Sequence, residues 1–393
     1  MGFNRVLLRS CVVRQSSFLQ HTAELPTAAQ NPTMRVTEHP RWFFRFTNAV
    51  KVIAVTILLV LISPTSLLAQ DQQKDQRKDH WTDLERIVAI GDLHGDYAQY
   101  QALLNLNGIV DDQGHWQAGR THLVQLGDVP DRGADSLQII RSLMQLQKEA
   151  SKSGGVVHTL IGNHEAMNIL GDLRYVHPGE YAALVTRKSA RLQKNYLAKV
   201  IAHRTKSDPT LANDQDGLMR QLANQYPLGY IEHRVLWQPG GEIAKWVAGN
   251  PAVIRINRTL FCHGGINPHA ELVPIEELNA GISAVLSQAD NPPENPATRE
   301  DGILWYRGLT TGDETTGLSA VENMLAFYDV DRIVIAHTPT RGEIVSRFGG
   351  RVVMADTGIS AFYGGHLANL VIEGSTLYSQ TPAGRKNLSI EVR

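Results

Sequence analysis

The chain has 393 residues and a formal net charge of −1, and its 42% of hydrophobic residues is typical of a globular protein. The charge is uneven, because residues 1–70 carry seven lysines and arginines against two acidic residues, which leaves an acidic body. Such a body argues against broad nucleic-acid binding, which depends on clustered basic side chains. With two cysteines, Cys11 and Cys262, a disulfide framework is excluded, and we expect Cys262 to be buried.

The apolar stretch 52–62 is the first recognisable element of the chain. It is short for a membrane span, which takes about 20 residues, but it suits the apolar region of a secretory signal. Basic residues precede it and small residues follow it. Leu67 lies where a signal peptidase prefers a small residue, so an uncleaved membrane anchor stays possible. The length of chain before the signal makes Met34 an alternative start to Met1.

We therefore expect residues 1–70 to be an N-terminal extension with a signal peptide or membrane anchor, followed by a polar linker at 71–85. The protein would then be exported, either periplasmic or secreted, or anchored to the membrane by residues 52–62. The globular domain would cover residues 86–378, with a C-terminal tail at 379–393.

Five short runs rich in Val and Ile end at glycine or at a potential metal ligand, and such runs predict buried strands. They are residues 86–90, 122–126, 156–161, 259–262 and 333–336. Helical patterns at 97–107 and 135–150 lie between the first three. Alternating strands and helices predict an α/β fold, in which ligands bind at the carboxyl ends of the strands.

Residues 172–250 interrupt this alternation with many helix-forming and basic residues, and we expect a mostly helical insertion that covers the cleft. Residues 288–299 have the composition of a loop. Four further strands are predicted in the C-terminal part, as a second sheet stacked on the first. They are residues 343–346, 351–354, 367–373 and 375–379.

The first two predicted strands end in motifs that supply carboxylate and imidazole groups. Asp92 and His94 lie two residues apart in Gly91-Asp92-Leu93-His94-Gly95, so in an extended segment both side chains face the same way and could bind one ion. Asp128 follows the next strand, in Gly127-Asp128-Val129-Pro130-Asp131-Arg132-Gly133. Because a carboxylate has two oxygens, Asp128 is a candidate bridge between two ions.

The later strands end in donors for a second ion. Asn163, in Gly162-Asn163-His164-Glu165, offers an amide oxygen, while His263 and His337 offer imidazole nitrogens. Oxygen and nitrogen donors without thiolates suit Mn, Fe or Zn. Two such divalent or trivalent ions a few ångströms apart activate water for attack on phosphorus.

His164 is a candidate general acid that protonates the leaving oxygen, with Asp131 or Glu165 orienting its imidazole and raising its pKa. Spacing alone does not decide between this role and that of a metal ligand. Arginine matches two phosphate oxygens at once, which makes Arg132 and Arg307 candidate phosphate ligands. For the second position, spacing alone does not favour Arg307 over Arg174 or Arg234.

The ordered motifs resemble those of the calcineurin-like metallophosphoesterases, and within them the phosphoprotein phosphatase group. The resemblance covers about residues 86–378. Ala336-His337-Thr338-Pro339 and Trp305-Tyr306-Arg307-Gly308 look more narrowly like the bacterial-type Shewanella-like phosphatases. The family resemblance implies a four-layer αββα sandwich of two mixed sheets flanked by helices, with the insertion at 172–250, and two bound metals.

The resemblance also implies roles for individual residues. One ion would be bound by Asp92, His94 and Asp128, and the other by Asp128, Asn163, His263 and His337. His164 and Asp131 would be the acid pair, and Arg132 and Arg307 would bind the phosphate. Several members of this branch prefer phosphotyrosine. The C-terminal signature of the eukaryotic enzymes is absent, and Ala355-Asp356-Thr357-Gly358 stands in that region, so their regulatory subunits are not carried over.

The sequence thus predicts a binuclear-metal-dependent phosphomonoesterase, acting on a phosphorylated protein or a small phosphoester, with a possible phosphotyrosine preference. One alternative is a dinucleoside polyphosphate or other nucleotide hydrolase on the same scaffold, which a deep basic pocket with an aromatic base platform would favour. Another is a catalytically inactive metal-binding protein, against which the intact Asp131, His164 and two arginines argue. No nucleic acid is expected as a partner, and a membrane only through an uncleaved N-terminal segment.

Overall fold

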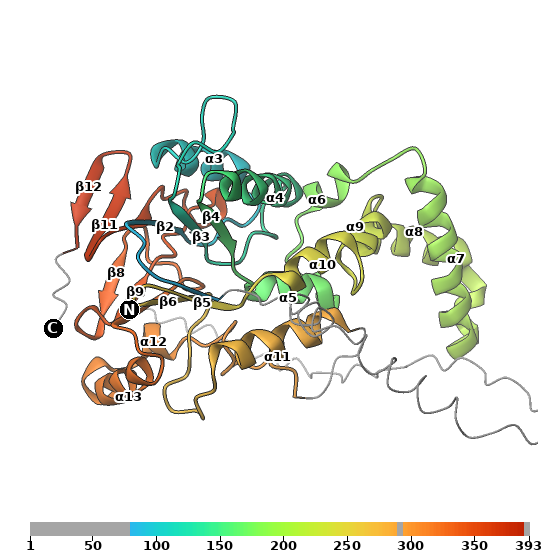
Figure 1. Cartoon of the computed structure of the whole chain (residues 1–393). Coiled ribbons are helices and arrows are strands. Elements are labelled where there is room, and N and C mark those ends of the chain that lie inside the picture. Colours follow the sequence, from blue (N-terminus) through green and yellow to red (C-terminus); the bar gives the residue numbers. More distant parts are fainter. Residues whose placement is uncertain (1–78, 289–293, 389–393) are drawn as a thin grey trace, which may run out of the picture. The chain divides into compact units, whose positions relative to one another are not determined.

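The computed structural model describes residues 79–288 and 294–388 (Figure 1). The predicted N-terminal extension, including the apolar stretch 52–62, lies outside these residues. Within the two described ranges, no helix combines the length and the apolar character needed to cross a membrane.

Two mixed sheets of six strands each form the centre of the fold (Figure 1). The first has the order β12-β11-β10-β2-β3-β4, in which β2 to β4 run parallel and β10 pairs antiparallel with β2. Its strands are β2 (Arg86–Ile90), β3 (His122–Gln125), β4 (Val156–Thr159), β10 (Asn369–Glu373), β11 (Thr376–Thr381) and β12 (Gly384–Asn387).

The second sheet has the order β1-β5-β6-β7-β9-β8, with β6, β7 and β9 parallel to one another. Its strands are β1 (His80–Trp81), β5 (Val253–Ile256), β6 (Thr259–Cys262), β7 (Arg332–Ile335), β8 (Val345–Arg347) and β9 (Val352–Met354).

Alternate side chains of each strand enter different cores, because successive residues of a strand face opposite sides of the sheet. Ile87 and Ala89 of β2 belong to a buried cluster that also contains Phe261 and Val334, so this cluster joins the inner faces of the two sheets. Val88 of β2 instead contacts the helices outside the first sheet. The layers are therefore helix, sheet, sheet and helix, which confirms the predicted α/β sandwich.

Helices α3 (Tyr97–Leu106) and α4 (Ser136–Lys152) cover the outer face of the first sheet. Ile139, Ile140, Leu143 and Leu146 form the buried stripe of α4, as its periodicity predicts. The outer face of the second sheet carries α11 (Ile275–Ser287) and α13 (Glu314–Phe327). The short elements α12 (Gly308–Thr311), η2 (Phe348–Gly350) and η3 (Ala361–Tyr363) lie in connecting loops.

The C-terminal strands do not form one separate sheet, so that part of the sequence prediction is wrong. β8 and β9 join β7 in the second sheet, whereas β10 and β11 return to the first sheet beside β2. The apolar pattern of a strand records that it is buried, and it does not specify which neighbour the strand pairs with.

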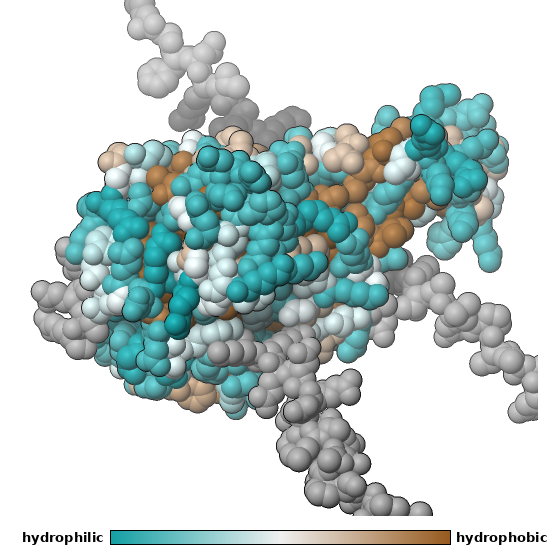
Figure 2. Space-filling view, turned by 45° about the horizontal axis from the view of Figure 1, so that its top comes forward, coloured by the Kyte–Doolittle hydropathy of each residue, from teal (hydrophilic) through white to brown (hydrophobic). Residues whose placement is uncertain are grey.

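The region predicted as a helical insertion lies between β4 and β5 and contains six helical segments after α5 (Asn163–Leu170). These are α6 (Pro178–Ala183), α7 (Ser189–Ser207), η1 (Pro209–Asp214), α8 (Gln215–Gln225), α9 (Tyr230–Trp237) and α10 (Glu242–Gly249). α7 and α8 share a small core of their own, which includes Leu197 and Leu222. Hydrophobic residues also gather between the sandwich and the part of the insertion that contains α7 and α8 (Figure 2).

Candidate metal centre and phosphate site

Five of the predicted site residues have a strained backbone. His94, Asp128, Asp131, Arg132 and His337 have φ between 45° and 74°, although none of them is glycine. The described residues contain ten such positions in all, so half of them coincide with the predicted site. Each position of this kind costs about 1–3 kcal/mol, and such strain gathers at functional sites where the surrounding structure holds it in place.

Four predicted ligand atoms converge on one point at the carboxyl ends of β3, β4, β6 and β7. Nε2 of His263 lies 3.0 Å from Oδ1 of Asn163, 3.1 Å from Nδ1 of His337 and 3.2 Å from Oδ2 of Asp128. Atoms that share an ion at about 2.1 Å lie roughly this far apart. The side chains of His263, Asn163 and His337 are all buried.

The hydrogen bonding of His263 indicates that this cluster binds a cation. Its Nδ1 lies 2.9 Å from the carbonyl oxygen of Leu126, which accepts the ring proton and leaves Nε2 with a lone pair. That lone pair then faces the oxygens of Asn163 and Asp128, and acceptors this close repel one another unless a cation lies between them. Nε2 of His337 is buried and has no hydrogen-bond partner among the described residues.

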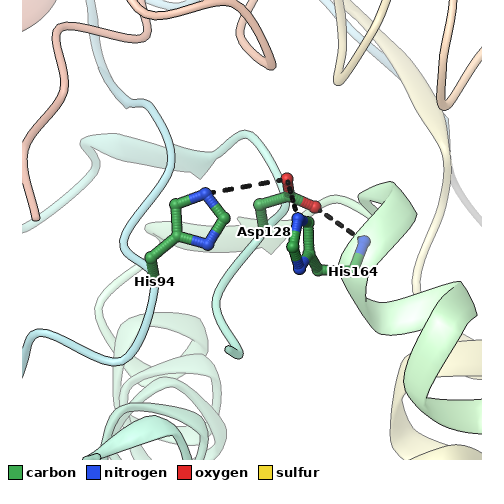
Figure 3. Close-up of side chains that lie close together, drawn as sticks. All are labelled: His94, Asp128 and His164. Carbon is green, nitrogen blue, oxygen red and sulfur yellow. Dashed lines mark hydrogen bonds and ion pairs between the residues drawn. The ribbon is translucent and has the colours of Figure 1, made fainter. Parts of the chain in front are cut away.

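A second group of donors lies on the other side of Asp128. Nε2 of His94 lies 3.8 Å from Oδ2 of Asp92 and 4.0 Å from Oδ2 of Asp128. Figure 3 shows the rings of His94 and His164 next to the Asp128 carboxylate, and the two ring centres lie 4.8 Å apart. The carbonyl oxygen of Pro130, 3.2 Å from Nδ1 of His94, orients this ring with Nε2 toward the carboxylates. Asp128 therefore contacts both donor groups, as a bridging ligand must.

Asp356 is a site residue whose role the sequence did not predict. It follows β9, is 1% exposed, and its Oδ2 has no hydrogen-bond partner among the described residues. Burial, then the charges of Asp356 and Asp128, raise the pKa of Asp92 well above its usual value. Burial likewise raises the pKa of Asp356 to about 6. Three carboxylates in one buried region need positive charge nearby, which two metal ions would supply.

The imidazoles have the protonation state that a metal ligand needs. Burial lowers the pKa of His94 to about 3 and that of His337 to about 2, so both rings are neutral at physiological pH. The residues present thus fit a binuclear centre.

His164 is hydrogen-bonded to Asp131, with 2.5 Å between its Nδ1 and Oδ2 of the carboxylate. Its Nε2 lies 3.8 Å from Oδ2 of Asp128 (Figure 3). Burial disfavours the imidazolium, but the charges of Asp128 and Asp131 outweigh it and raise the pKa of His164. A protonated Nε2 aimed at the centre suits a general acid. The ligand role is also geometrically possible, because donor atoms of His94, Asp128 and His164 lie within 4.8 Å of one another.

Two residues absent from the sequence prediction support Asp131. Asn168 of α5 donates to Oδ1 of Asp131 at 2.9 Å, and the backbone N–H of Asp131 donates to Glu180 of α6 at 3.0 Å. Glu180 is buried, and burial followed by the charge of Asp131 raises its pKa to about 8. No spacing rule links residues 131 and 180, so the sequence carried no signal for this contact.

Glu165, the alternative partner of His164, has a different position. Its carboxylate accepts from the backbone N–H groups of Asp128, Val129 and Gly162, at 2.8–3.0 Å. It therefore fixes the loop that carries Asp128. Gly162 is required at this point, because a Cβ there would lie 2.3 Å from Oδ1 of Asp128.

The four candidate arginines differ in the hydrogen-bond acceptors that their guanidinium N–H groups already have. NH1 of Arg307 donates to the carbonyl oxygen of His337 and to Oγ1 of Thr338, both at 2.7 Å, which places this arginine at the centre. The buried Nε of Arg132 has no acceptor among the described residues. Arg174 is paired with Asp172, and Arg234 donates to backbone carbonyls of α5. Arg132 and Arg307 are therefore the better candidates for phosphate binding.

Comparisons with known proteins agree with this geometry. The sequence profile of the calcineurin-like phosphoesterases matches residues 85–341. The chain belongs to this family. It is 32% identical over 297 residues to an uncharacterized protein of Schizosaccharomyces pombe, covering 73% of this chain and 76% of that protein. It is 28% identical over 281 residues to Shewanella-like protein phosphatase 2 of Arabidopsis thaliana, covering 70% and 72% of the two chains.

A solved structure has the same fold. The cold-active protein-tyrosine phosphatase of a psychrophilic Shewanella species superimposes with a TM-score of 0.59 at 25% identity, covering 79% of this chain and 82% of that one. The resemblance recognised from the motifs is thereby confirmed, and so are the α/β fold and the assignment of this chain to the phosphatases. Neither comparison assigns a role to any single residue.

Proposed function

We propose that this protein is a binuclear-metal-dependent protein phosphatase that hydrolyses phosphomonoesters. The observation that carries the proposal is the convergence of His263, Asn163 and His337 on the Asp128 carboxylate, beside a hydrogen-bonded His164–Asp131 pair. The relatives named as protein phosphatases support phosphorylated proteins as substrates.

Two bound ions would supply a Lewis acid and a water of lowered pKa, which is the chemistry that phosphoester hydrolysis needs. Asp92, His94 and Asp128 would hold one ion, and Asp128, Asn163, His263 and His337 the other. Asp356 lies next to Asp92 and adds negative charge, which would favour binding of cations there. The buried, strained loops keep these donors in place, so little reorganisation is needed when substrate binds.

The remaining residues act on the substrate. Arg132 and Arg307 bind the phosphoryl oxygens and balance the negative charge that develops in the transition state. Nε2 of His164 delivers a proton to the leaving alcohol oxygen. Asp131 accepts from Nδ1 and so keeps the ring in the orientation and protonation state that this transfer needs.

The donor set fits Mn, Fe or Zn. A preference for phosphotyrosine is supported by the likeness to the Shewanella protein-tyrosine phosphatase. Export, or anchoring through residues 52–62, is supported by the basic and apolar composition of the N-terminal extension.

The test is hydrolysis of p-nitrophenyl phosphate with Mn²⁺, before and after EDTA, together with the metal content of the purified protein. We expect two ions per chain and activity that EDTA abolishes and Mn²⁺ restores. A phosphopeptide panel compared with dinucleoside polyphosphates separates the phosphatase from a nucleotide hydrolase. A protein with both ions bound but no turnover of any of these substrates would instead support the metal-binding alternative.

A further inference from the structure

Three aromatic rings surround the guanidinium of Arg132. Its Cζ lies over the ring of Tyr175, 4.1 Å from the ring centre, and over Phe362 and Tyr363 at 4.7 Å and 5.7 Å. Cation–π attraction acts within about 6 Å of a ring centre. The buried Nε of Arg132 has no acceptor among the described residues, so this donor is available for a phosphate.

The ring of Phe362 projects from a loop that is tied to the metal centre. Residues 361–363 form η3, in which the backbone N–H of Ala361 donates to Oδ2 of Asp96 at 2.8 Å. The next ring, of Tyr363, lies 5.2 Å from the imidazole of His94. Phe362 therefore has a fixed position beside the site.

Phe362 is nevertheless 57% exposed, which makes it an unusual residue beside a buried centre. An exposed aromatic ring costs free energy in water and gains it when another apolar group covers it. The ring of Tyr175, which also contacts Arg132, lies 5.2 Å from that of His164, the proposed general acid. The guanidinium of Arg132 lies against both Tyr175 and Phe362, so the leaving group of a phosphoester bound to Arg132 would meet the exposed side of the Phe362 ring.

We propose that Phe362 binds the aryl ring of an aromatic phosphoester, a phosphotyrosyl side chain, while Arg132 holds its phosphate. This inference rests on the proposed phosphatase function. It names the residue that would make the site select aryl over alkyl phosphoesters. A phosphoserine side chain has no ring to place against Phe362, whereas a tyrosyl ring can pack with its centre about 4.5–7 Å away.

The test compares wild type, Phe362→Ala and Phe362→Trp, all loaded with Mn²⁺, on one peptide sequence carrying either phosphotyrosine or phosphoserine. Phe327→Ala is the matched control, because Phe327 is also exposed, at 49%, but lies on α13 outside the site. We expect Phe362→Ala to lower kcat/KM for the phosphotyrosine peptide about 10-fold relative to the phosphoserine peptide. Phe362→Trp and Phe327→Ala should keep the wild-type ratio within about 3-fold.

Inhibition by inorganic phosphate provides a second readout, and it should stay unchanged in Phe362→Ala if Arg132 still holds its position. An equal loss on both peptides would show that Phe362 only positions Arg132, and it would overturn the inference. So would a loss confined to a dinucleoside polyphosphate, which would assign the Phe362 ring to a nucleobase. A wild-type protein without chelator-sensitive turnover would contradict the proposed function itself, whereas an active one with an unchanged ratio would contradict only the aryl site.

Discussion

Replacing His164 by asparagine tests the catalytic role against the ligand role that the geometry also permits. The substitution removes the 2.5 Å bond to Asp131 and the Nε2 that faces Asp128, but it keeps the backbone N–H of residue 164, which donates to Oδ1 of Asp128 at 2.9 Å. The bridging carboxylate thus keeps its local support. We expect two ions to remain bound.

The size of the effect follows from proton transfer. A positioned general acid contributes about 10²–10⁴-fold, or roughly 3–5 kcal/mol of activation free energy. The contribution depends on how much the leaving oxygen needs the proton. The tyrosine phenol has a pKa of about 10 and the serine hydroxyl a much higher one, whereas nitrophenolate leaves readily unprotonated. We therefore expect kcat to fall by about 10³-fold for a phosphoserine peptide, about 10²-fold for phosphotyrosine and under about 10-fold for p-nitrophenyl phosphate.

Steady-state kinetics on the three substrates, with metal analysis of the same preparation, measure both parts of the prediction. His269→Asn is the control, because His269 is exposed on a loop and its side chain takes no part in the site. An equal loss on all three substrates would contradict the acid role. Loss of one ion would show that His164 is a ligand, as its distance from His94 and Asp128 permits.

Three further changes test other parts of the site. Asp128→Asn should abolish both ion binding and turnover, since Asp128 faces both donor groups; a variant that keeps its ions and its rate would contradict the bridging role. Gly162→Ala should lower metal occupancy by displacing Asp128, whereas Gly249→Ala, whose Cβ meets nothing within 4 Å, should not; equal occupancy in both would refute the steric argument. The pKa of Glu180 is raised to about 8 from 4.5, so between these pH values the native state keeps the proton that the unfolded chain releases. The free energy of unfolding therefore falls as pH rises from about 4.5 to 8. Urea unfolding should show Glu180→Gln gaining on wild type between pH 5 and 8, by at most about 5 kcal/mol, and parallel pH profiles would disprove the shift.

The strand-end motifs were predictable because each is local. A run of β-branched residues followed by glycine and a candidate ligand is recognisable in a short segment of sequence. Because β2, β3 and β4 are parallel, their carboxyl ends bring Asp92, Asp128 and Asn163 to the same edge of the first sheet. The same rule extended to His263 and His337 in the second sheet, whose strands β6 and β7 are also parallel. Nothing in the sequence specified how these two sheets would divide the C-terminal strands.

Asp356 is a residue that short sequence motifs could not identify. It follows a strand as the candidate ligands do, yet no candidate ligand lies beside it in the sequence, and only its burial next to Asp92 identifies it. Asn168 could have been suspected from its position four residues after His164, on one face of α5, and its side chain does donate to the carbonyl oxygen of His164. Glu180, 49 residues from its partner, could not.

The insertion after α5 does more than add helices around the site. Glu180 of α6 accepts from the backbone N–H of Asp131, and Arg234 of α9 donates to the backbone carbonyl of Asn168, which in turn donates to Asp131. The segment leading into α6 supplies Tyr175, whose carbonyl oxygen accepts from the backbone N–H of Arg132 at 3.0 Å while its ring packs on the guanidinium. The candidate acid pair and the candidate phosphate ligand Arg132 are therefore both held partly by the insertion. A change of sequence there would alter the rate of hydrolysis together with the choice of substrate, because the same segment supports both groups.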